Sequence, residues 1–168
     1  MHISEIYKSI YNFYGNTTPL TVDCGKLCDG ACCKSDENEE TGMYLFPGEE
    51  VLFYNNPDFK IIDSEFFYSE KCAKILICSG SCKREQRPLS CRIFPIIPYI
   101  KNNDFELIFD PRAKSVCPLL SLPDFSGLDA DFIKKTKKVV RLLIKFRETR
   151  LFLEGLSDIL DDFLKFGA

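Results

Sequence analysis

Nine cysteines are the residues of this chain best suited to chemistry. Four lie within ten residues near the N-terminus, and five follow further along the chain: Cys24, Cys28, Cys32, Cys33, Cys72, Cys78, Cys82, Cys91 and Cys117. Thiolates are soft ligands that favour zinc, copper(I) and iron–sulfur clusters. Short spacings let one loop bring several sulfurs to one centre at little cost in chain entropy. The pattern therefore predicts a metal centre bound by cysteines.

The alternative interpretation of so many cysteines is a disulfide framework, as in small extracellular domains. Residues 1–15 lack the basic region, apolar run and small-residue cleavage site of a signal peptide, so we expect a cytoplasmic protein with reduced thiols. An odd number of cysteines would leave one sulfur unpaired, and a bridge between the adjacent Cys32 and Cys33 would strain the backbone. Metal binding is therefore preferred.

The residues around the cysteines indicate which sulfurs are ligands. Gly25 and Gly30 are expected to provide the positive φ angles needed to wrap the first loop around a centre. Proline precedes Cys91 by three residues and follows Cys117 directly, which would fix the direction of both sulfurs. Seven cysteines are thus predicted ligands: Cys24, Cys28, Cys32, Cys33, Cys82, Cys91 and Cys117. For Cys72 and Cys78 ligation is less secure, and Cys72 could equally be a small buried hydrophobic residue.

Three arginines accompany the cysteines, Arg87, Arg92 and Arg112. Each could donate hydrogen bonds to a negatively charged thiolate centre, or could pair with a carboxylate such as Asp110. The acidic stretch at 36–40 is expected to be a solvated loop, because hard carboxylates compete poorly with thiolates for a soft metal. Ligand type alone does not distinguish zinc, which takes four thiolates in a closed tetrahedron, from an iron–sulfur cluster.

Length and composition favour one folded domain over residues 1–168, with 45% hydrophobic and 28% charged residues. Apolar spacing predicts a helix over residues 3–14, ended by Gly15. A strand is predicted at 43–46, the first turns of a helix after Pro47, and short irregular strands at 59–62, 65–68, 74–78, 96–100 and 105–109. The predicted class is α+β: a small, loop-rich mixed domain around the metal centre, flanked by an N-terminal helix and C-terminal amphipathic helices.

The C-terminal region, about 129–168, has the apolar periodicity of amphipathic helices. Gly155 and Ser157 are predicted to separate a longer helix from a short final one. These helices could contact an unknown protein partner. The basic run at 134–150 is read as a solvated helix face, so nucleic-acid binding is not expected. The net charge of −3 and the lack of a long apolar run also argue against binding to nucleic acid or a membrane.

Three linked segments resemble a known family. The first cluster ending in CC, RPLSCRIFP at 87–95 and DPRAKSVCP at 110–118 are together similar to the YkgJ-type cysteine-cluster proteins, described as a zinc- or iron-chelating domain. The resemblance covers about residues 24–118. This chain departs from the pattern in having three residues in both gaps of CGKLCDGACC, and Arg84 and Glu85 where members carry an aromatic residue.

The segment is also similar, more distantly, to the cysteine-rich part of flagellin lysine N-methylases, a resemblance that implies an iron–sulfur cluster. We therefore expect an iron–sulfur protein, with a zinc-stabilised interaction module as the alternative. The chain lacks a phosphate loop, HExxH and a dinucleotide fingerprint, and its sole histidine, His2, is expected to be a disordered terminal residue. The resemblance thus implies a shared cluster module without the methylation reaction, and a stand-alone enzyme is not the preferred interpretation.

Overall fold

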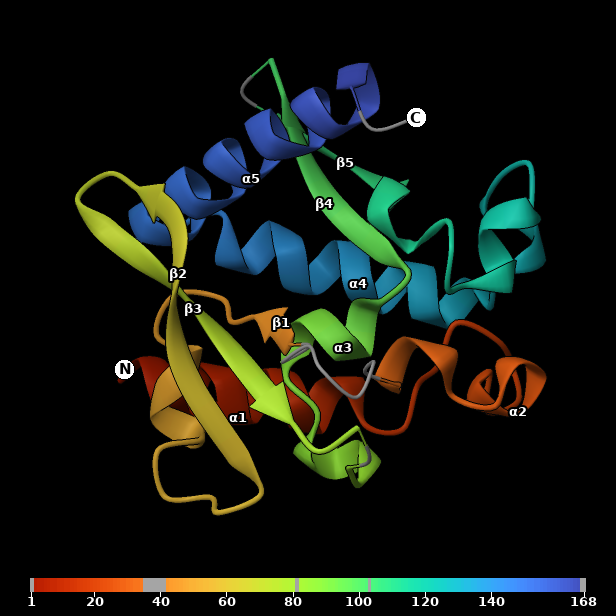
Figure 1. The fold of residues 1–168 in the computed structure, drawn as a ribbon, viewed down its shortest axis with the longest axis horizontal. Helices are drawn as coiled ribbons and strands as arrows, with labels where there is room; N and C mark the ends of the chain where they lie inside the picture. The colour runs from red at the N-terminus through yellow and green to blue at the C-terminus, as the bar shows by residue number, and fades with distance from the viewer. Residues whose placement is uncertain (1, 35–41, 81, 103, 167–168) are drawn as a thin grey trace.

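The computed structural model describes residues 2–34, 42–80, 82–102 and 104–166 (Figure 1). Helices and antiparallel strands are combined, so the predicted α+β class is confirmed. The helices are α1 (Ile3–Tyr14), α2 (Gly25–Cys28), α3 (Leu89–Ile93), α4 (Ala130–Leu143) and α5 (Arg147–Phe166). The strands are β1 (Gly42–Tyr44), β2 (Phe59–Tyr68), β3 (Lys71–Cys78), β4 (Ile96–Lys101) and β5 (Asp104–Phe109). Six short 3₁₀ turns lie between them: η1 (Ala31–Cys33), η2 (Glu49–Leu52), η3 (Arg84–Gln86), η4 (Pro111–Ala113), η5 (Pro118–Ser121) and η6 (Phe125–Gly127).

The N-terminal helix has the predicted bounds, and both of its ends are capped. Gly15 follows α1 with a φ of 55°, a conformation that costs glycine little. At the other end the His2 side chain accepts a hydrogen bond from the Ser4 N–H at 3.4 Å. His2 is therefore an ordered cap in this structure, contrary to the expectation of a disordered terminal residue, because its ring nitrogen meets one of the helix's free N–H groups.

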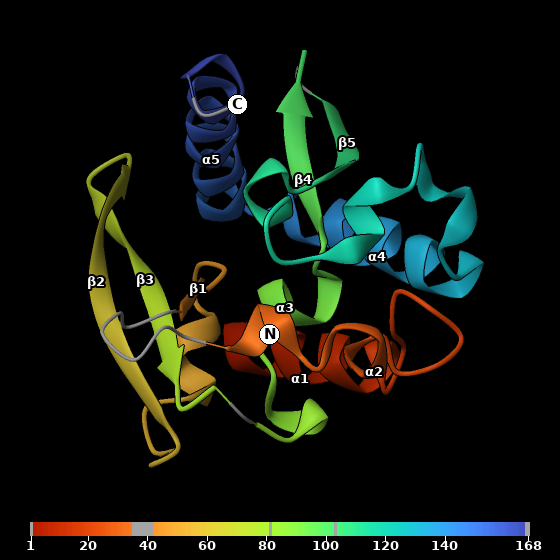
Figure 2. The same ribbon diagram turned by 45° about the vertical axis from the view of Figure 1, so that its right-hand side comes forward.

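Two antiparallel sheets replace the short irregular strands expected from the sequence. One has the strand order β1-β3-β2, and the other is the β4-β5 hairpin (Figure 2). Residues 59–62 and 65–68 belong to the single strand β2, whose pairing with β3 shifts register between Asp63 and Phe67. The polar residues between the two apolar runs form this irregularity and not a turn, since Ser64 accepts a hydrogen bond from the Phe66 N–H within the strand.

Two shorter predictions had mixed outcomes. The strand expected at 43–46 is confirmed only as far as Tyr44, and the helix after Pro47 is only the 3₁₀ turn η2. The Glu49 side chain folds back to accept a hydrogen bond from the Phe46 N–H at 3.0 Å. The acidic stretch predicted as a solvated loop at 36–40 lies outside the described residues.

The C-terminal helices are confirmed, but their predicted boundary is wrong. The chain turns at Ile144–Phe146, and α5 continues through Gly155 and Ser157. Ile144 and Phe146, at this turn, are partly buried and both pack on the core. Glycine at 155 permits close packing, because an added Cβ would lie 2.9 Å from the Phe66 ring. Ser157 is satisfied within the helix and accepts the Ile100 N–H.

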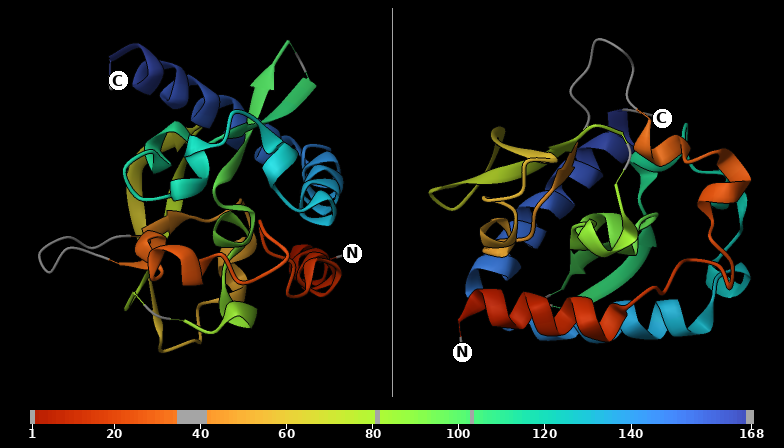
Figure 3. Two further views of the ribbon diagram at one scale, coloured as in Figure 1. Left: turned by 90° about the vertical axis from the view of Figure 1, so that its right-hand side faces the viewer. Right: turned by 90° about the horizontal axis from the view of Figure 1, so that it is seen from below.

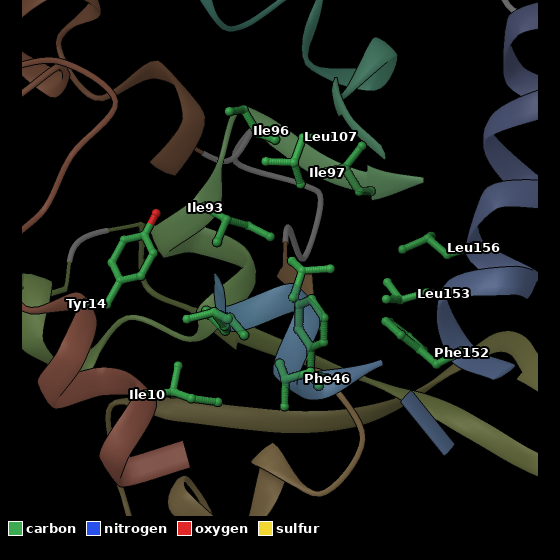
Figure 4. Packing of buried hydrophobic residues seen from close by; sticks show 14 of the residues in the cluster. Ile10, Tyr14, Phe46, Ile93, Ile96, Ile97, Leu107, Phe152, Leu153 and Leu156 are labelled. Carbon is green, nitrogen blue, oxygen red and sulfur yellow. The ribbon is translucent and has the colours of Figure 1, made fainter. Parts of the chain in front are cut away.

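One buried apolar cluster joins α1, α3, the hairpin and the two C-terminal helices. Phe152, Leu153 and Leu156 of α5 face the β4-β5 side, and Phe46 lies against Phe152 with ring centroids 5.7 Å apart (Figure 4). α1 runs beside α4, where Tyr14 packs on Phe132 (Figure 3, right). None of the helices in the described part of the chain is both long and apolar enough to cross a membrane.

Candidate metal centre

The cysteines lie mostly at the ends of short elements. Cys24 precedes α2 and Cys28 ends it, while Cys32 and Cys33 belong to the turn η1. Cys78 ends β3, Cys82 precedes η3, Cys91 lies within α3 and Cys117 precedes η5. All nine are free thiols. Cys32 is exposed, and the other eight are half-buried. The fold thus delivers these sulfurs from loops and strand ends, where the backbone can be shaped around a centre.

Two left-handed residues shape the first cysteine loop. Asp29 has a φ of 51° and Gly30 a φ of 64°, which reverse the chain between α2 and η1. Gly30 therefore has the predicted role, whereas Gly25 does not, because it is helical and Asp29 takes the second left-handed position. After the reversal, the Sγ atoms of the adjacent Cys32 and Cys33 lie 4.0 Å apart within η1.

Five cysteines line one cavity of about 390 Å³. They are Cys32, Cys33, Cys78, Cys82 and Cys91, contributed by η1, β3, the segment before η3, and α3. The lining of this cavity also includes the apolar residues Phe46, Ile97, Phe152 and Leu156, some of which Figure 4 shows facing one another across the core. Cys78, a doubtful ligand from the sequence, is thus brought to the predicted ligands Cys33, Cys82 and Cys91 by the β3 strand.

Arg87 is the positive partner of the cavity cysteines. It donates a hydrogen bond to the Cys82 sulfur, and its charge also acts on Cys91. Burial raises the pKa of the Cys91 and Cys82 thiols, and the Arg87 guanidinium opposes that rise. Its Nε is buried and has no hydrogen-bond partner among the described residues. Arg87 therefore holds a spare buried N–H beside several sulfurs.

Cys24, Cys28 and Cys117 form a second neighbourhood. Burial raises the pKa of Cys24, with Cys117 and Cys28 adding to the rise and Arg84 opposing it. Burial also raises the pKa of Cys117. The hydrogen bond from the Leu119 N–H opposes this rise, and the nearby Cys28 adds to it. Cys24 and Cys117 pack against the hydrophobic core. These three predicted ligands are therefore close enough to interact electrostatically, although they come from segments almost ninety residues apart.

Cys72 lies apart from both neighbourhoods, near the other end of β3 from Cys78. Its Sγ is 2.7 Å from the Ser64 carbonyl oxygen, to which it donates. A thiol bonded to a strand carbonyl fits the interpretation of Cys72 as a small, half-buried side chain of the sheet.

The other two arginines proposed as thiolate donors have different partners. Arg112 forms a two-pronged ion pair with the buried Asp110, with distances of 2.9 and 2.7 Å. Arg92 donates to the backbone carbonyls of Arg87, Gly15 and Glu85 and lies over the Tyr11 ring. Arg112 therefore pairs with a carboxylate, one of the two roles expected from the sequence. Arg92 instead connects the backbone segments around α3.

Arg84 is a connecting residue that the sequence analysis missed. It forms an ion pair with Asp23 at 2.6 Å, joining η3 to the segment directly before Cys24. The hydrogen bond from Cys32 is the main cause that lowers the pKa of Cys33, and the charges of Arg87 and, more weakly, Arg84 lower it further. The available signal in the sequence is a basic residue two positions after Cys82.

A buried carboxylate supports the helix that carries Cys91. Glu49 is completely buried and accepts hydrogen bonds from the Tyr11 hydroxyl, the Phe46 N–H and, at 2.6 Å, the Leu89 N–H. Leu89 begins α3, so Glu49 connects α1, η2 and α3 at one point. Burial raises the pKa of Glu49 to about 7 despite these hydrogen bonds.

Within the part of the chain that the structure describes, no three His, Cys, Asp or Glu side chains form a ready-made site for a metal ion. No protein-family model, curated protein or solved structure matches the chain. The resemblance to YkgJ-type proteins therefore stays a prediction, and so does the set of seven ligands.

Proposed function

We propose that this protein binds an iron–sulfur cluster through its cysteine thiolates. The observation that carries the proposal is the convergence of five cysteines, from four separate segments, on one cavity of about 390 Å³. Sulfurs from distant parts of a chain meet at one cavity most simply when they share a ligand. Thiolates are the protein ligands that iron–sulfur clusters use.

The size and lining of the cavity favour a polyatomic centre over one zinc ion. A tetrahedral zinc site is compact, with four sulfurs about 2.3 Å from a single ion. A volume of about 390 Å³ is instead in the range of pockets for small molecules and cofactors, roughly 300–1,000 Å³. The apolar wall from β4 and α5 would exclude water, one of the factors that set the potential of a cluster.

Arg87 supports the same assignment. Its buried Nε lacks a partner among the described residues, and its guanidinium already donates to Cys82. Hydrogen bonds to cluster or cysteine sulfur stabilise the negative charge of such a centre. The residues present therefore fit a thiolate-bound cluster, with Arg87 as a donor beside it.

The proposed role of the cluster is electron transfer, redox sensing or service to a partner protein that carries out a modification. The distant resemblance to flagellin lysine N-methylases suggests the third of these. A partner contact through the C-terminal helices is part of the proposal: most of their apolar residues are buried in the core, but Phe163, Leu164 and Phe166 are exposed near the end of α5. We also propose that the protein is cytoplasmic, where its thiols would remain reduced.

A zinc-stabilised interaction module is the second candidate. The separation of 4.0 Å between the Cys32 and Cys33 sulfurs favours it, because two ligands at about 2.3 Å in a tetrahedron are roughly 3.8 Å apart. Zinc would supply folding stability to the loop-rich half without redox chemistry.

Purification without oxygen and with iron supplied tests the proposal. The protein should be brown, absorb broadly in the visible range and contain sulfide in roughly stoichiometric amount to iron. Cys91→Ser should lose most of the iron and colour, whereas Cys72→Ser should retain both, because the Cys72 thiol is bonded within its strand. A colourless wild-type protein that contains only zinc would contradict the cluster and favour the zinc module.

A further inference from the structure

The cavity that the cysteines line is also lined by residues of the hydrophobic core. Protein interiors are close-packed, and spaces larger than a water molecule are few in each domain. This cavity nevertheless has a volume of about 390 Å³ and extends to buried residues of β4 and α5. A space of this size inside the core is typical of a site for a small molecule.

Most of the lining other than the cysteines is apolar. Figure 4 shows Phe152 and Leu156 of α5 facing toward Phe46 and Ile97. A ligand that lies here would therefore exchange water for hydrocarbon over most of its surface. The buried apolar residues of the lining, each at most 6% exposed, include Phe46, Ile93, Ile96, Ile97, Phe152 and Leu156.

The cations of the lining differ in their partners. Lys34 forms an ion pair with Asp29 at 2.6 Å, and Arg112 forms one with Asp110 at 2.7 Å. Arg87 has no carboxylate partner in the described part of the chain, and its buried Nε meets no hydrogen-bond acceptor there. Buried N–H groups without an acceptor are rare in native proteins, so an acceptor from outside the chain is expected at Arg87.

We propose that this cavity binds a small organic carboxylate, with its carboxyl group on Arg87 and its apolar body against Ile97, Phe152 and Leu156. The apolar lining and the unpartnered cation lie in one cavity, and an acid with a hydrocarbon body matches both. The inference deepens the proposed function and rests on it, because it names the class of molecule that would lie beside the cluster.

The charge of the lining favours a carboxylate over a phosphate. One unpaired cation neutralises a monoanion, whereas a phosphate dianion would leave a net charge in an apolar cavity, which is costly. Arginine has five N–H donors and commonly binds a carboxylate through two of them. Arg87 can therefore hold a carboxylate through its Nε–H and a second N–H while another N–H donates to Cys82.

Calorimetric titration with butanoate, hexanoate and octanoate tests the apolar part of the site. The full chain is purified without oxygen and with iron supplied. Each buried CH₂ should tighten binding by about fourfold, so octanoate should bind much more tightly than butanoate. Equal affinities for the three acids would overturn the assignment of the apolar body to this cavity.

Octanol tests the carboxylate, because it has the same hydrocarbon body without the charge. Octanoate should bind about tenfold more tightly than octanol, as expected for a hydrogen bond to a charged group. Arg87→Gln should remove this difference. Lys138→Gln, which changes an exposed cation of α4 outside the cavity, should preserve it. Equal binding of octanol and octanoate by the wild type would refute the role of Arg87.

The position of the bound acid is measured by NMR, which keeps the test valid if Arg87→Gln does not fold. Octanoate should show intermolecular contacts with the methyl groups of Ile97 and Leu156. Leu164 is the control, because it is 53% exposed near the end of α5 and lies outside the cavity lining. Contacts with Leu164 alone would show adventitious surface binding and overturn the proposal.

Iron and sulfide are measured in the same samples, which separates this inference from the proposed function. A brown protein that binds none of the acids would overturn the carboxylate site and leave the cluster proposal intact. A colourless protein that binds octanoate at Ile97 and Leu156 would refute the cluster and leave the carboxylate site in place.

Discussion

The buried carboxylate of Glu49 makes stability depend on pH in an unusual direction. Because burial raises the pKa of Glu49 from 4.5 to about 7, the folded chain binds this proton more tightly than the unfolded chain does. The contribution to stability is complete below about pH 4.5 and is lost as the pH rises through about 7. The groups that interact with this carboxylate are Tyr7 and Tyr11 of α1 and Arg92 of α3.

The magnitude follows from the two pKa values. A rise from 4.5 to about 7, at about 1.36 kcal/mol per pKa unit, corresponds to about 3 kcal/mol in the free energy of unfolding. Most of it, about 2–3 kcal/mol, should be lost between pH 5 and pH 8. Glu49→Gln removes the titrating carboxyl group. It also places an amide NH₂ opposite at least one of the three groups that donate to Glu49, which are the Tyr11 hydroxyl, the Phe46 N–H and the Leu89 N–H. One buried donor then lacks an acceptor, which costs about 1–3 kcal/mol at every pH.

Urea unfolding of the wild type and of Glu49→Gln at several pH values from 5 to 8, in the same reductant and the same metal state, measures this effect. The wild type should be more stable than the variant at pH 5, and its advantage should shrink or reverse by pH 8. Taking the difference between the two proteins cancels the titration of groups common to both. Two stability curves that remain parallel over this range would refute the argument, because Glu49 would then titrate alike in the folded and unfolded chains.

Two further predictions concern how α5 packs. Phe152→Ala should lower the free energy of unfolding by about 3–5 kcal/mol, because the ring is 1% exposed and contacts Phe46, Phe66 and Tyr68. Phe166→Ala is the control and should change the free energy of unfolding by less than about 0.5 kcal/mol, because Phe166 is 85% exposed. Denaturant unfolding of both variants checks this, and equal effects would show that α5 does not pack as described. Gly155→Ala should destabilise by about 1–3 kcal/mol, since its Cβ would lie 2.9 Å from the Phe66 ring, although alanine is the better helix former by about 1 kcal/mol. Asp158→Ala on the exposed face of α5 is the matched control, and a stabilising effect of Gly155→Ala would contradict the close approach.

The sequence predicted the elements whose pattern is local. The helix over residues 3–14 and its glycine end follow from apolar spacing and one terminating residue, and the solvated basic face of α4 follows from its charges, since Lys134, Lys138 and Arg141 are exposed. The α+β class followed from the same periodicities. These features depend on residues within a few positions of each other, which a sequence shows directly.

Other boundaries depended on tertiary packing. Gly155 resembles a helix break in the sequence, but it lies inside α5 because the Phe66 ring of a distant strand occupies the space of a Cβ. The turn at Ile144–Phe146 contains neither glycine nor proline, and both apolar residues pack on the core. Such contacts join residues far apart in the chain, so no local pattern encodes them.

The cysteines illustrate the same distinction within the candidate site. Their number, type and short spacings were enough to predict soft-metal ligands from the sequence alone. The sequence did not predict which sulfurs lie near each other. Cys78 comes close to Cys33 and Cys91 only through the course of β3, and Cys117 comes close to Cys24 only through the fold of the segment after β5. The sequence thus determined the chemistry available to this protein, and tertiary structure decided how the sulfurs are grouped, because grouping depends on distances between segments that only packing brings together.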